Sequence, residues 1–416
     1  MKQFSIILII IALIFPITAL GARPKKNSQK KKEAPNPTEV LTQAKTAFYD
    51  YKFDKAIELI NKYETEIEEF DKQIPAEMQH LLAKAEIGSN MMSRVERIAI
   101  IDSITVDKND FFSHYNLSKP SGYILSSDDL PGDFNSNDST TVYVTESGET
   151  MIWSRKTNDG TDRELIETHR LADGTWEEPI ALGEALEGIF ANYPFLQPDG
   201  ITLYFAAQGE ESLGGYDIFI SRNDGDDYLQ PQNLGMPYNS PYNDYLLAID
   251  EQTGAGWWAT DRKQIKDKVT IYVFMPQELR INYAVDDPNL AKYASVTSIA
   301  ATLDPQKDYS QIRQAIKSLE SEIAAESSNF TIAVPGKGIL THYEQFESPD
   351  AQEAMRQQQA CIDELNEMEI TLDELRRQYA TDKSLKDKIL KLEIEIDKMR
   401  KEIKRLTNEV IRLEIF

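Results

Sequence analysis

The chain has 416 residues, a formal net charge of −24 at neutral pH and a single cysteine, Cys361. Such an acidic chain argues against nucleic acid as a partner, because phosphate binding needs a basic surface. One cysteine excludes an internal disulfide framework. The length is sufficient for two or three domains, so we expect a multidomain protein that is held together by packing alone.

Residues 1–21 have the features of a secretory signal peptide. Lys2 gives a short positive region, residues 6–17 are nearly all apolar, and residues 19–21 fit a small-x-small cleavage site. The apolar run is short for a membrane span of about 20 residues, which favours a cleaved signal over an uncleaved anchor. No cysteine lies near the end of this run, which excludes a lipidated cysteine as the anchor. The sequence therefore predicts export.

Residues 22–37 are a basic arm and linker. The cations of this arm are Arg23, Lys25, Lys26, Lys30, Lys31 and Lys32. One interpretation is a solvated, disordered tail. The other is an arm that contacts an anionic lipid surface.

Residues 38–93 show helical periodicity. Asn36 is expected to cap the first helix, Asp54 the second, and a third helix is expected to start at Pro75. The segment AKTAFYDYKFDKAIELI, residues 44–60, resembles one tetratricopeptide unit. About three such units are generally needed to stand alone, so we expect these helices to pack on the next domain or on a partner. A plain helical cap is the alternative.

From residue 94 to residue 346 the pattern changes to short strands separated by turn residues. Two strands are predicted within residues 192–222, and the turn Pro198-Asp199-Gly200 precedes the first of them. The block at residues 176–183 recurs at residues 228–235, 52 positions later. A repeat of about fifty residues that is built from short strands is typical of a β-propeller blade.

The segment PFLQPDGITLYFAAQGEESLGGYDIFISR, residues 194–222, resembles the WD-like β-propeller repeat of TolB-type proteins. Together with NLGMPYNSPYNDY, residues 233–245, it is similar to a branch found in cell-envelope proteins of Bacteroidetes-type bacteria. The resemblance implies a periplasmic or outer-membrane-associated location. It also implies structural roles for the motif positions, which are Pro198, Asp199, Gly200, Gly214, Gly215, Tyr216, Asp217, Asn243 and Asp244. The peptidoglycan-binding domain with which such proteins often end is not found in this sequence.

Three sequence blocks support the repeat, at about residues 131–183, 190–236 and 242–276. A closed propeller usually has at least four blades, so further strands are expected from residues 95–127 and from residues 329–341. We predict a small propeller that is closed by the early strands. The alternative is an open stack of sheets whose edges are covered by helices.

Residues 347–416 are helical, and their later half carries a heptad seam. The seam residues are Leu385, Ile389, Leu392, Ile396, Met399, Ile403, Leu406, Val410 and Leu413. β-Branched residues at a with leucine at d favour a parallel two-stranded coiled coil, in which two Cys361 side chains could bridge in an oxidising compartment. An earlier seam, residues 361–379, falls out of phase near residues 381–384. The alternative to the homodimer is therefore an antiparallel hairpin within one chain.

No motif in the sequence indicates catalysis. The four histidines are far apart in the chain, and there is neither a nucleophile elbow nor a phosphate loop. We therefore expect no catalytic residue, no cofactor and no metal. Trp257 and Trp258 adjoin in a predicted strand, so one is expected in the core and the other at the rim or on a partner.

The fold class that we predict is mixed but mainly β: a small or incomplete propeller with an N-terminal helical-repeat segment and a C-terminal coiled coil. The resemblance implies a non-catalytic scaffold of the cell envelope that binds envelope proteins of unknown identity. The alternatives are a periplasmic module that binds glycan or peptidoglycan and, third, a glycan-active enzyme.

Overall fold

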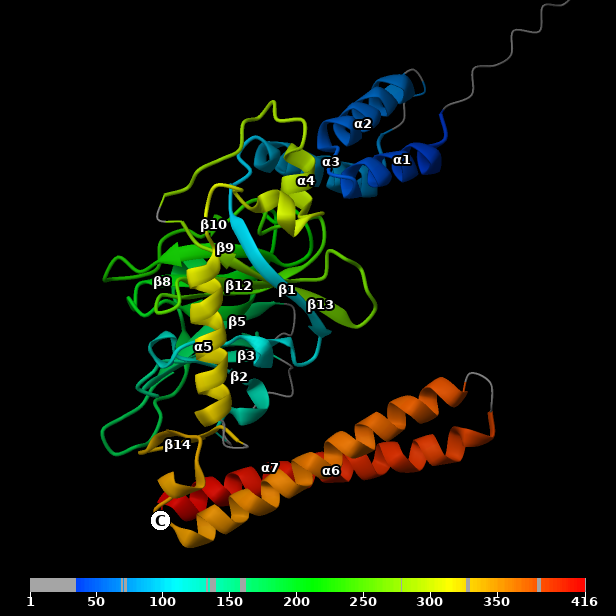
Figure 1. Ribbon diagram of the computed structural model, residues 1–416. Helices are drawn as coiled ribbons and strands as arrows, with labels where there is room; N and C mark the ends of the chain where they lie inside the picture. Colours follow the sequence, from blue (N-terminus) through cyan, green and yellow to red (C-terminus); the bar gives the residue numbers. More distant parts are fainter. Residues whose placement is uncertain are drawn as a thin grey trace, which may run out of the picture.

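The computed structural model describes residues 35–415 with short gaps at residue 69 and at residues 71–72, 132–133, 135–139, 158–161, 278, 327–329 and 380–382. The predicted signal peptide and nearly all of the basic arm lie outside the described residues. The fold combines helices with antiparallel sheets. Figure 1 shows three parts: N-terminal helices, a body of sheets, and a long two-helix arm.

The N-terminal part consists of α1 (Pro37–Tyr49), α2 (Phe53–Glu68) and α3 (Ala76–Met92). The predicted cap of α1 is confirmed, because the Asn36 carboxamide accepts a hydrogen bond of 3.0 Å from the Thr38 amide. The predicted cap of α2 is wrong. That helix already includes Phe53, and the Asp54 carboxylate accepts a hydrogen bond of 2.6 Å from the Ser89 hydroxyl of α3.

These helices pack on the sheets rather than standing apart. Their apolar faces share one cluster with Leu213 and Met236 from loops of the body and with Leu290 of α4 (Leu290–Ser295). Lys84 of α3 donates hydrogen bonds to the carbonyl oxygens of Gly209 and Ser212. Apolar burial and this lysine together fix the helices to one end of the body.

Three antiparallel sheets form the body, one from each of the repeated sequence blocks. The first contains β2 (Tyr123–Ser126), β3 (Thr141–Val144), β4 (Thr150–Lys156), β5 (Arg163–His169) and β6 (Ile180–Ala181). The second contains β7 (Phe190–Leu196), β8 (Thr202–Gln208), β9 (Asp217–Arg222) and β10 (Gln232–Asn233). The third contains β11 (Asp244–Asp250), β12 (Ala255–Thr260), β13 (Lys268–Met275) and, from much earlier in the chain, β1 (Ala99–Asp107).

The strand β1 completes the third sheet by pairing antiparallel with β13, with Asp107 opposite Lys268. Further strands were expected from residues 95–127, and β1 is one of them. In the third sheet β1 occupies the edge position that β6 and β10 occupy in the first and second sheets. The last repeated block contributes β11, β12 and β13 to its sheet, and β1, which precedes the repeats in the chain, supplies the remaining strand.

Successive sheets share one apolar core. Ile152 of the first sheet, Phe205 of the second and Trp257 of the third are all buried in it. Trp258 points to the other face of β12, where it packs with Tyr238, Tyr272 and Phe274. Both tryptophans are at most 2% exposed, so the expectation that one of them lies at the rim or on a partner is wrong.

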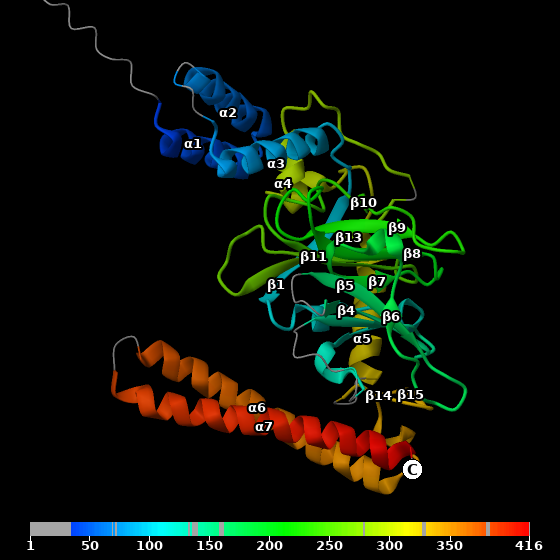
Figure 2. The same ribbon diagram turned by 180° about the vertical axis from the view of Figure 1, so that it is seen from behind.

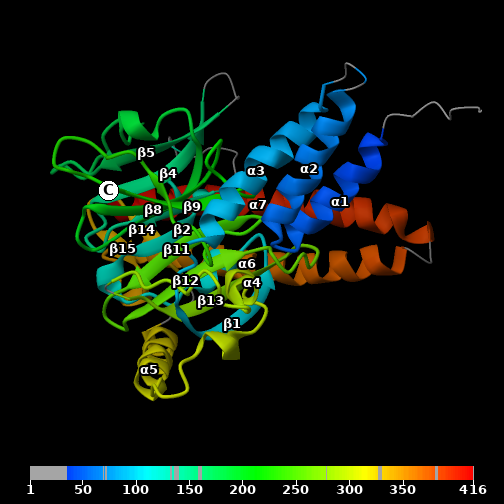
Figure 3. The same ribbon diagram turned by 90° about the horizontal axis from the view of Figure 1, so that it is seen from above.

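Helices and short elements cover the remaining sides of the body. Ile312 and Ile316 of α5 (Ser310–Glu326) pack against the shared core, and Figures 1 and 3 show this helix along one side of the sheets. The strands β14 (Ile332–Val334) and β15 (Gly338–Leu340) pair only with each other, so they extend none of the three sheets. The described 3₁₀-helices are η1 (Phe111–His114), η2 (Lys119–Ser121), η3 (Ser127–Asp129), η4 (Glu184–Leu186), η5 (Ile299–Thr302), η6 (Tyr343–Gln345) and η7 (Lys383–Leu385).

The arm consists of α6 (Pro349–Tyr379) and α7 (Lys386–Ile415), which lie antiparallel within one chain. The heptad pattern allows a parallel dimer or an antiparallel hairpin, and the structure has the hairpin. Ion pairs between the two helices join Arg376 to Glu393 at 2.8 Å and Arg400 to Glu369 at 2.7 Å. Of the predicted seam, Ile396, Leu406 and Val410 are buried, whereas Leu385, Ile389, Leu392, Met399, Ile403 and Leu413 are half-buried.

The base of the arm is fixed to the body through a buried carboxylate. Glu414 is 3% exposed and accepts hydrogen bonds from the Lys337 ammonium at 2.7 Å and from the Glu347 amide at 2.8 Å. Lys337 lies between β14 and β15, and β14 also contacts α7. Figures 1 and 2 both place the arm at the end of the body opposite to α1–α3.

The contact between the second and third sheets leaves no room for a side chain at Gly214. A Cβ atom there would overlap the carbonyl oxygen of Tyr242. We expect Gly214→Ala to lower the free energy of unfolding by more than ~2 kcal/mol, because backbone atoms of both loops would have to move. Chemical denaturation would measure the change.

Gly209→Ala is the matched control, since no atom lies within 4 Å of a Cβ built on Gly209. Its effect should stay within about 0.5 kcal/mol. Equal effects of the two substitutions would contradict the proposed close approach of the loops.

Candidate functional site

A pocket of about 440 Å³ lies where the α1–α2 turn meets the third sheet. We call it the junction pocket. The lining residues are Tyr49, Asp50, Tyr51, Tyr242, Arg262, Lys263, Tyr272, Ser295, Val296 and Thr297. They come from the N-terminal helices, from loops of the third sheet and from the end of α4, so packing of the helices on the body creates the pocket.

The floor of the junction pocket is set by an ion pair between Asp244 and Arg262, whose side chains are at most 3% exposed. The Arg262 Nη2 lies 2.8 Å from the Asp244 carboxylate and donates a second hydrogen bond to the Tyr238 carbonyl. The same carboxylate accepts hydrogen bonds from the amide and hydroxyl of Ser240 at 2.6 and 2.7 Å. These contacts compensate two charges that would be costly to bury alone.

Two buried polar atoms of the pocket make no hydrogen bond to any described residue: the Nη1 of Arg262 and the hydroxyl oxygen of Tyr51. Both residues are 8% exposed. Tyr51 adopts a positive φ of 60°, which is uncommon for a residue with a bulky side chain. Buried polar groups without a partner are rare in folded proteins, and each of these two atoms has less than 1 Å² of accessible surface, so both lie beneath the surface of the pocket.

Aromatic rings and a lysine complete the walls. The rings of Tyr49 and Tyr242 stack with their centroids 5.1 Å apart, and Tyr49 is 46% exposed. The Lys263 ammonium lies 5.5 Å from the centre of the Tyr272 ring. The pocket thus combines hydrogen-bond donors with flat apolar surfaces.

The charge states of these groups follow from their surroundings. Burial lowers the pKa of Arg262, but the Asp244 carboxylate and the nearby Tyr51 and Tyr272 side chains together outweigh burial, so the pKa is raised and the guanidinium stays charged. Burial raises the pKa of Tyr51 above its ordinary value, although Arg262 acts in the opposite direction, so the hydroxyl keeps its proton at neutral pH. Partial burial lowers the pKa of Lys263.

The motif residues of the second sheet meet those of the third beside this pocket. Asp217 is fully buried and accepts hydrogen bonds from the amides of Leu213 and Gly214 at 2.8 and 3.0 Å. The Asn243 carboxamide oxygen accepts a hydrogen bond of 3.1 Å from the Tyr216 amide. The amide of Gly215 donates to the Tyr242 carbonyl at 2.9 Å. These bonds hold the two loops together, and so position Tyr242 and Asp244.

Burial, with the nearby Asp244 carboxylate adding to it, raises the pKa of Asp217 to about 7. The amide donors around Asp217 act in the opposite direction without cancelling the rise. The stability contributed by neutral Asp217 is therefore complete below the ordinary pKa of 3.8 and is lost as the pH rises through about 7.

The turn Pro198-Asp199-Gly200 lies apart from the junction pocket, between β7 and β8. Its Asp199 carboxylate accepts hydrogen bonds from the amides of Ile201 and Thr202, each at 2.8 Å, and Gly200 has a positive φ of 68°. Of the predicted motif positions, none is a lining residue of the pocket. Asp244 lies beneath it as the ion-pair partner of the lining residue Arg262, and Asn243 binds the Tyr216 amide in the contact between the two loops.

Sequence reasoning missed the residues that give the pocket its character: Tyr49, Tyr51, Tyr242, Arg262, Lys263 and Tyr272. One available signal was Arg262, because an arginine two residues after the apolar strand GWWAT needs a buried partner if the chain turns inward there. The approach of Tyr51 depends on how the helices pack, which no local pattern in this sequence indicates.

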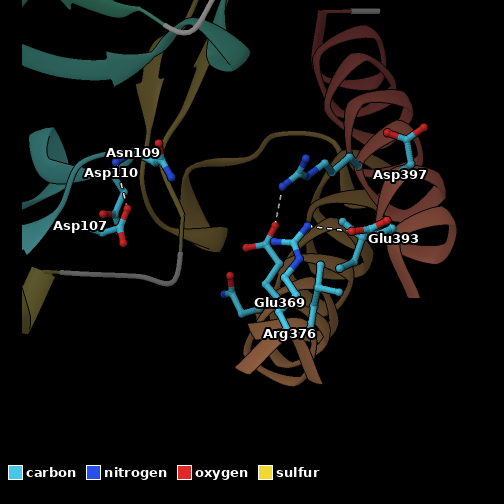
Figure 4. A pocket seen from close by; sticks show the side chains of 11 residues that line it. Asp107, Asn109, Asp110, Glu369, Arg376, Glu393 and Asp397 are labelled. Carbon is cyan, nitrogen blue, oxygen red and sulfur yellow. Dashed lines mark hydrogen bonds and ion pairs between the residues drawn. The ribbon is translucent and has the colours of Figure 1, made fainter. Parts of the chain in front are cut away.

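Figure 4 shows a second pocket, of about 550 Å³, between the β1–η1 turn and the arm. Its arginines already pair with Glu369 and Glu393, and Asp107, Asp110 and Asp397 add further carboxylates. In the described part of the chain, no group of three or more histidine, cysteine or carboxylate side chains is placed to hold a metal ion. This second pocket therefore has fewer groups available to bind a ligand than the junction pocket.

Comparison with known proteins gives no match: neither a family model, nor a curated protein, nor a solved structure is significantly similar to this chain. Across the residues that the structure describes, no helix has the length and apolar character needed to cross a membrane.

Removal of Arg262 should show how much the fold depends on the buried pair. We expect Arg262→Met to lower the free energy of unfolding by ~3–5 kcal/mol, because the Asp244 charge would remain buried without its partner. The double variant Arg262→Met/Asp244→Asn should recover part of that loss. Urea denaturation of both variants and of Asp244→Asn completes the cycle, and additive losses would contradict direct coupling of the two charges.

Proposed function

We propose that this chain is an exported, non-catalytic scaffold of the bacterial cell envelope that holds a partner protein through its two-helix arm. The main observation that supports this proposal is the two-helix arm. It is anchored at its base by Glu414, lies opposite to α1–α3, and extends past the body in the views of Figures 1 and 2.

The outer faces of the arm are more apolar than contacts within the chain require. Ile370, Leu390 and Ile394 are 68%, 47% and 57% exposed. None of them belongs to the seam between α6 and α7, so pairing of the helices leaves these side chains available. Exposed apolar residues on a projecting element favour contact with another protein.

The body would serve as the rigid support for this arm. We propose that the three sheets form a small propeller of WD-like, TolB-type repeats, with the N-terminal helices related to a tetratricopeptide unit. The 52-residue recurrence in the sequence, the folding of each block as one sheet and the completion of the third sheet by β1 support this assignment. In this proposal the location is the periplasm or the outer-membrane-associated envelope.

A second function, binding of glycan or peptidoglycan fragments, is favoured by the junction pocket. Its tyrosine walls and the Lys263 ammonium suit a small polar ligand better than a flat protein surface. The two functions use opposite ends of the molecule, so one chain could perform both.

Photo-crosslinking in the source bacterium would test the role of the arm. With a photoreactive amino acid in place of Ile394, we expect a discrete adduct between this chain and an envelope protein, because the side chain faces outward from the arm. An adduct with twice the mass of the chain would identify the partner as a second copy, joined through the C-terminal helices.

The matched control places the same amino acid at Ile201, which is 47% exposed on the body. This position should give no comparable adduct. If Ile394 and Ile370 both fail to form an adduct, or form no more than Ile201 does, the proposed scaffold function of the arm is wrong.

A further inference from the structure

We propose that a second copy of this chain pairs with the edge strand β1, so that two bodies join through one continuous sheet. The contact is an antiparallel pairing of residues 102–108 with the same residues of the other copy. This inference goes beyond the proposed function, because it concerns the body. It depends neither on the arm nor on the junction pocket.

The edge that β1 forms is much longer than the corresponding edges of the other two sheets. β1 has nine residues, whereas β6 and β10 have two each. Short edge strands protect a sheet from pairing with other chains, because an edge presents unpaired amide and carbonyl groups. No described strand pairs with the outer side of β1. The third sheet therefore ends in an edge that is long enough to accept another strand.

Other parts of the chain cover only the first half of this edge. The Ile100 amide donates a hydrogen bond of 3.0 Å to the Thr302 hydroxyl of η5. The Ile101 carbonyl accepts a hydrogen bond of 3.4 Å from Arg313 of α5. A bulge in the pairing with β13 follows directly, between Ile100 and Asp102. The second half of β1 begins after this bulge.

In the second half of β1, alternate backbone groups face away from β13. The amide of Lys108 donates to the Asp267 carbonyl at 3.1 Å. Because the residues of a strand bond to its two sides in alternation, the backbone groups of Ser103, Thr105 and Asp107 then point outward. The Ser103 amide bonds only the carboxylate of the preceding residue, at 2.7 Å. The amides of Thr105 and Asp107 have no hydrogen bond to a described residue on the outer side.

The surroundings leave this half of the edge accessible. Ile104 is 48% exposed, and the side chains at positions 102 and 105 are exposed as well. A hollow of about 580 Å³ lies beside the strand, and its lining includes residues 101–104 of β1 together with Ile316 and Lys317 of α5. The space between the edge and α5 is therefore open to an incoming strand.

The register of the pairing follows from the use of all three outward residues in each copy. When Thr105 lies opposite Thr105 of the second copy, Ser103 lies opposite Asp107, and each outward amide meets an outward carbonyl. This pairing has two-fold symmetry, so it closes as a dimer and leaves no free edge on β1.

The same register matches side chains across the interface. Asp102, which has no ion pair with a described residue within 4 Å, comes opposite Lys108 of the second copy. The Lys108 side chain lies 3.6 Å from Asp261 and is still 45% exposed, so one side of its ammonium can meet another carboxylate. Ile104 comes opposite Val106. Opposite charges and apolar pairs across strands both stabilise a sheet.

Neighbouring registers are less favourable. A shift by two residues in one direction places Asp102 opposite Asp110, where two carboxylates repel each other. A shift by two residues in the other direction places Asp107 opposite Ile101, whose carbonyl is already bound by Arg313. The described contacts therefore favour the pairing centred on Thr105.

Sedimentation equilibrium of the full chain would test the proposal. One strand pair is a small interface, so measurements should extend from about 1 to about 500 μM. We expect a monomer–dimer equilibrium within this range.

Two variants locate the interface. Ile104→Lys should weaken the dimer at least tenfold, because a charge replaces the apolar partner of Val106 in each half of the contact. Thr105→Pro should abolish the dimer, because it removes the outward amide at the centre and leaves the bonds between β1 and β13 in place. Ile201→Lys is the matched control, since Ile201 is 47% exposed on a turn of the body. It should dimerise as the parent does.

Other outcomes would overturn the proposal. A monomer at every concentration, or equal weakening by Ile104→Lys and Ile201→Lys, would contradict pairing through β1. A dimer that persists in Ile104→Lys but is lost in Ile394→Lys would place the interface in the arm. If Thr105→Pro does not fold, Ile104→Lys still decides the question, because that side chain is exposed. The crosslink from the arm is a separate measurement, so failure of the scaffold function and failure of this dimer are distinguishable.

Discussion

The structure depends most on one buried ion pair, between Asp244 at the start of β11 and Arg262 just after β12. Burying two charges costs little only when they pair with each other and accept or donate further hydrogen bonds. The Ser240 and Tyr238 contacts do this from the loop that leads into the third sheet. That loop is in turn held by Asn243, whose carboxamide bonds the Tyr216 backbone of the second sheet. A chain of short polar contacts thus connects the sheets to each other and to the surface on which the helices rest.

The same arrangement produces the candidate site. Asp244 and the Tyr238 carbonyl bind the Arg262 guanidinium from within the body, and Arg262 also lines the pocket that the α1–α2 turn completes. Docking of the helices through Lys84 and the apolar cluster around Leu213 therefore stabilises the fold and also forms the candidate site.

Much of the local structure could be predicted from the sequence. The Asn36 cap, the two strands around the Leu213–Gly215 loop and the 52-residue recurrence all reflect short-range patterns of turn residues and apolar side chains. That residues 95–127 supply a further strand was predicted, but the pairing of β1 with β13 was not, because it joins segments more than 150 residues apart and either strand could have formed an edge. The heptads of the arm did not distinguish a hairpin from a dimer, because both bury the same seam. The pocket escaped prediction because its tyrosines come from three distant segments.

Hydrogen exchange of individual backbone amides would test the central claim most directly. The amides of Leu213 and Gly214 donate to buried Asp217, and the amide of Ser240 donates to buried Asp244. If these contacts join the parts into one cooperative unit, the three loop amides should exchange only through global unfolding, as slowly as the central strands β8 and β12 do. Exchange as fast as that of exposed loop amides, such as those around Gly225, would show that the loops open independently and would contradict this account.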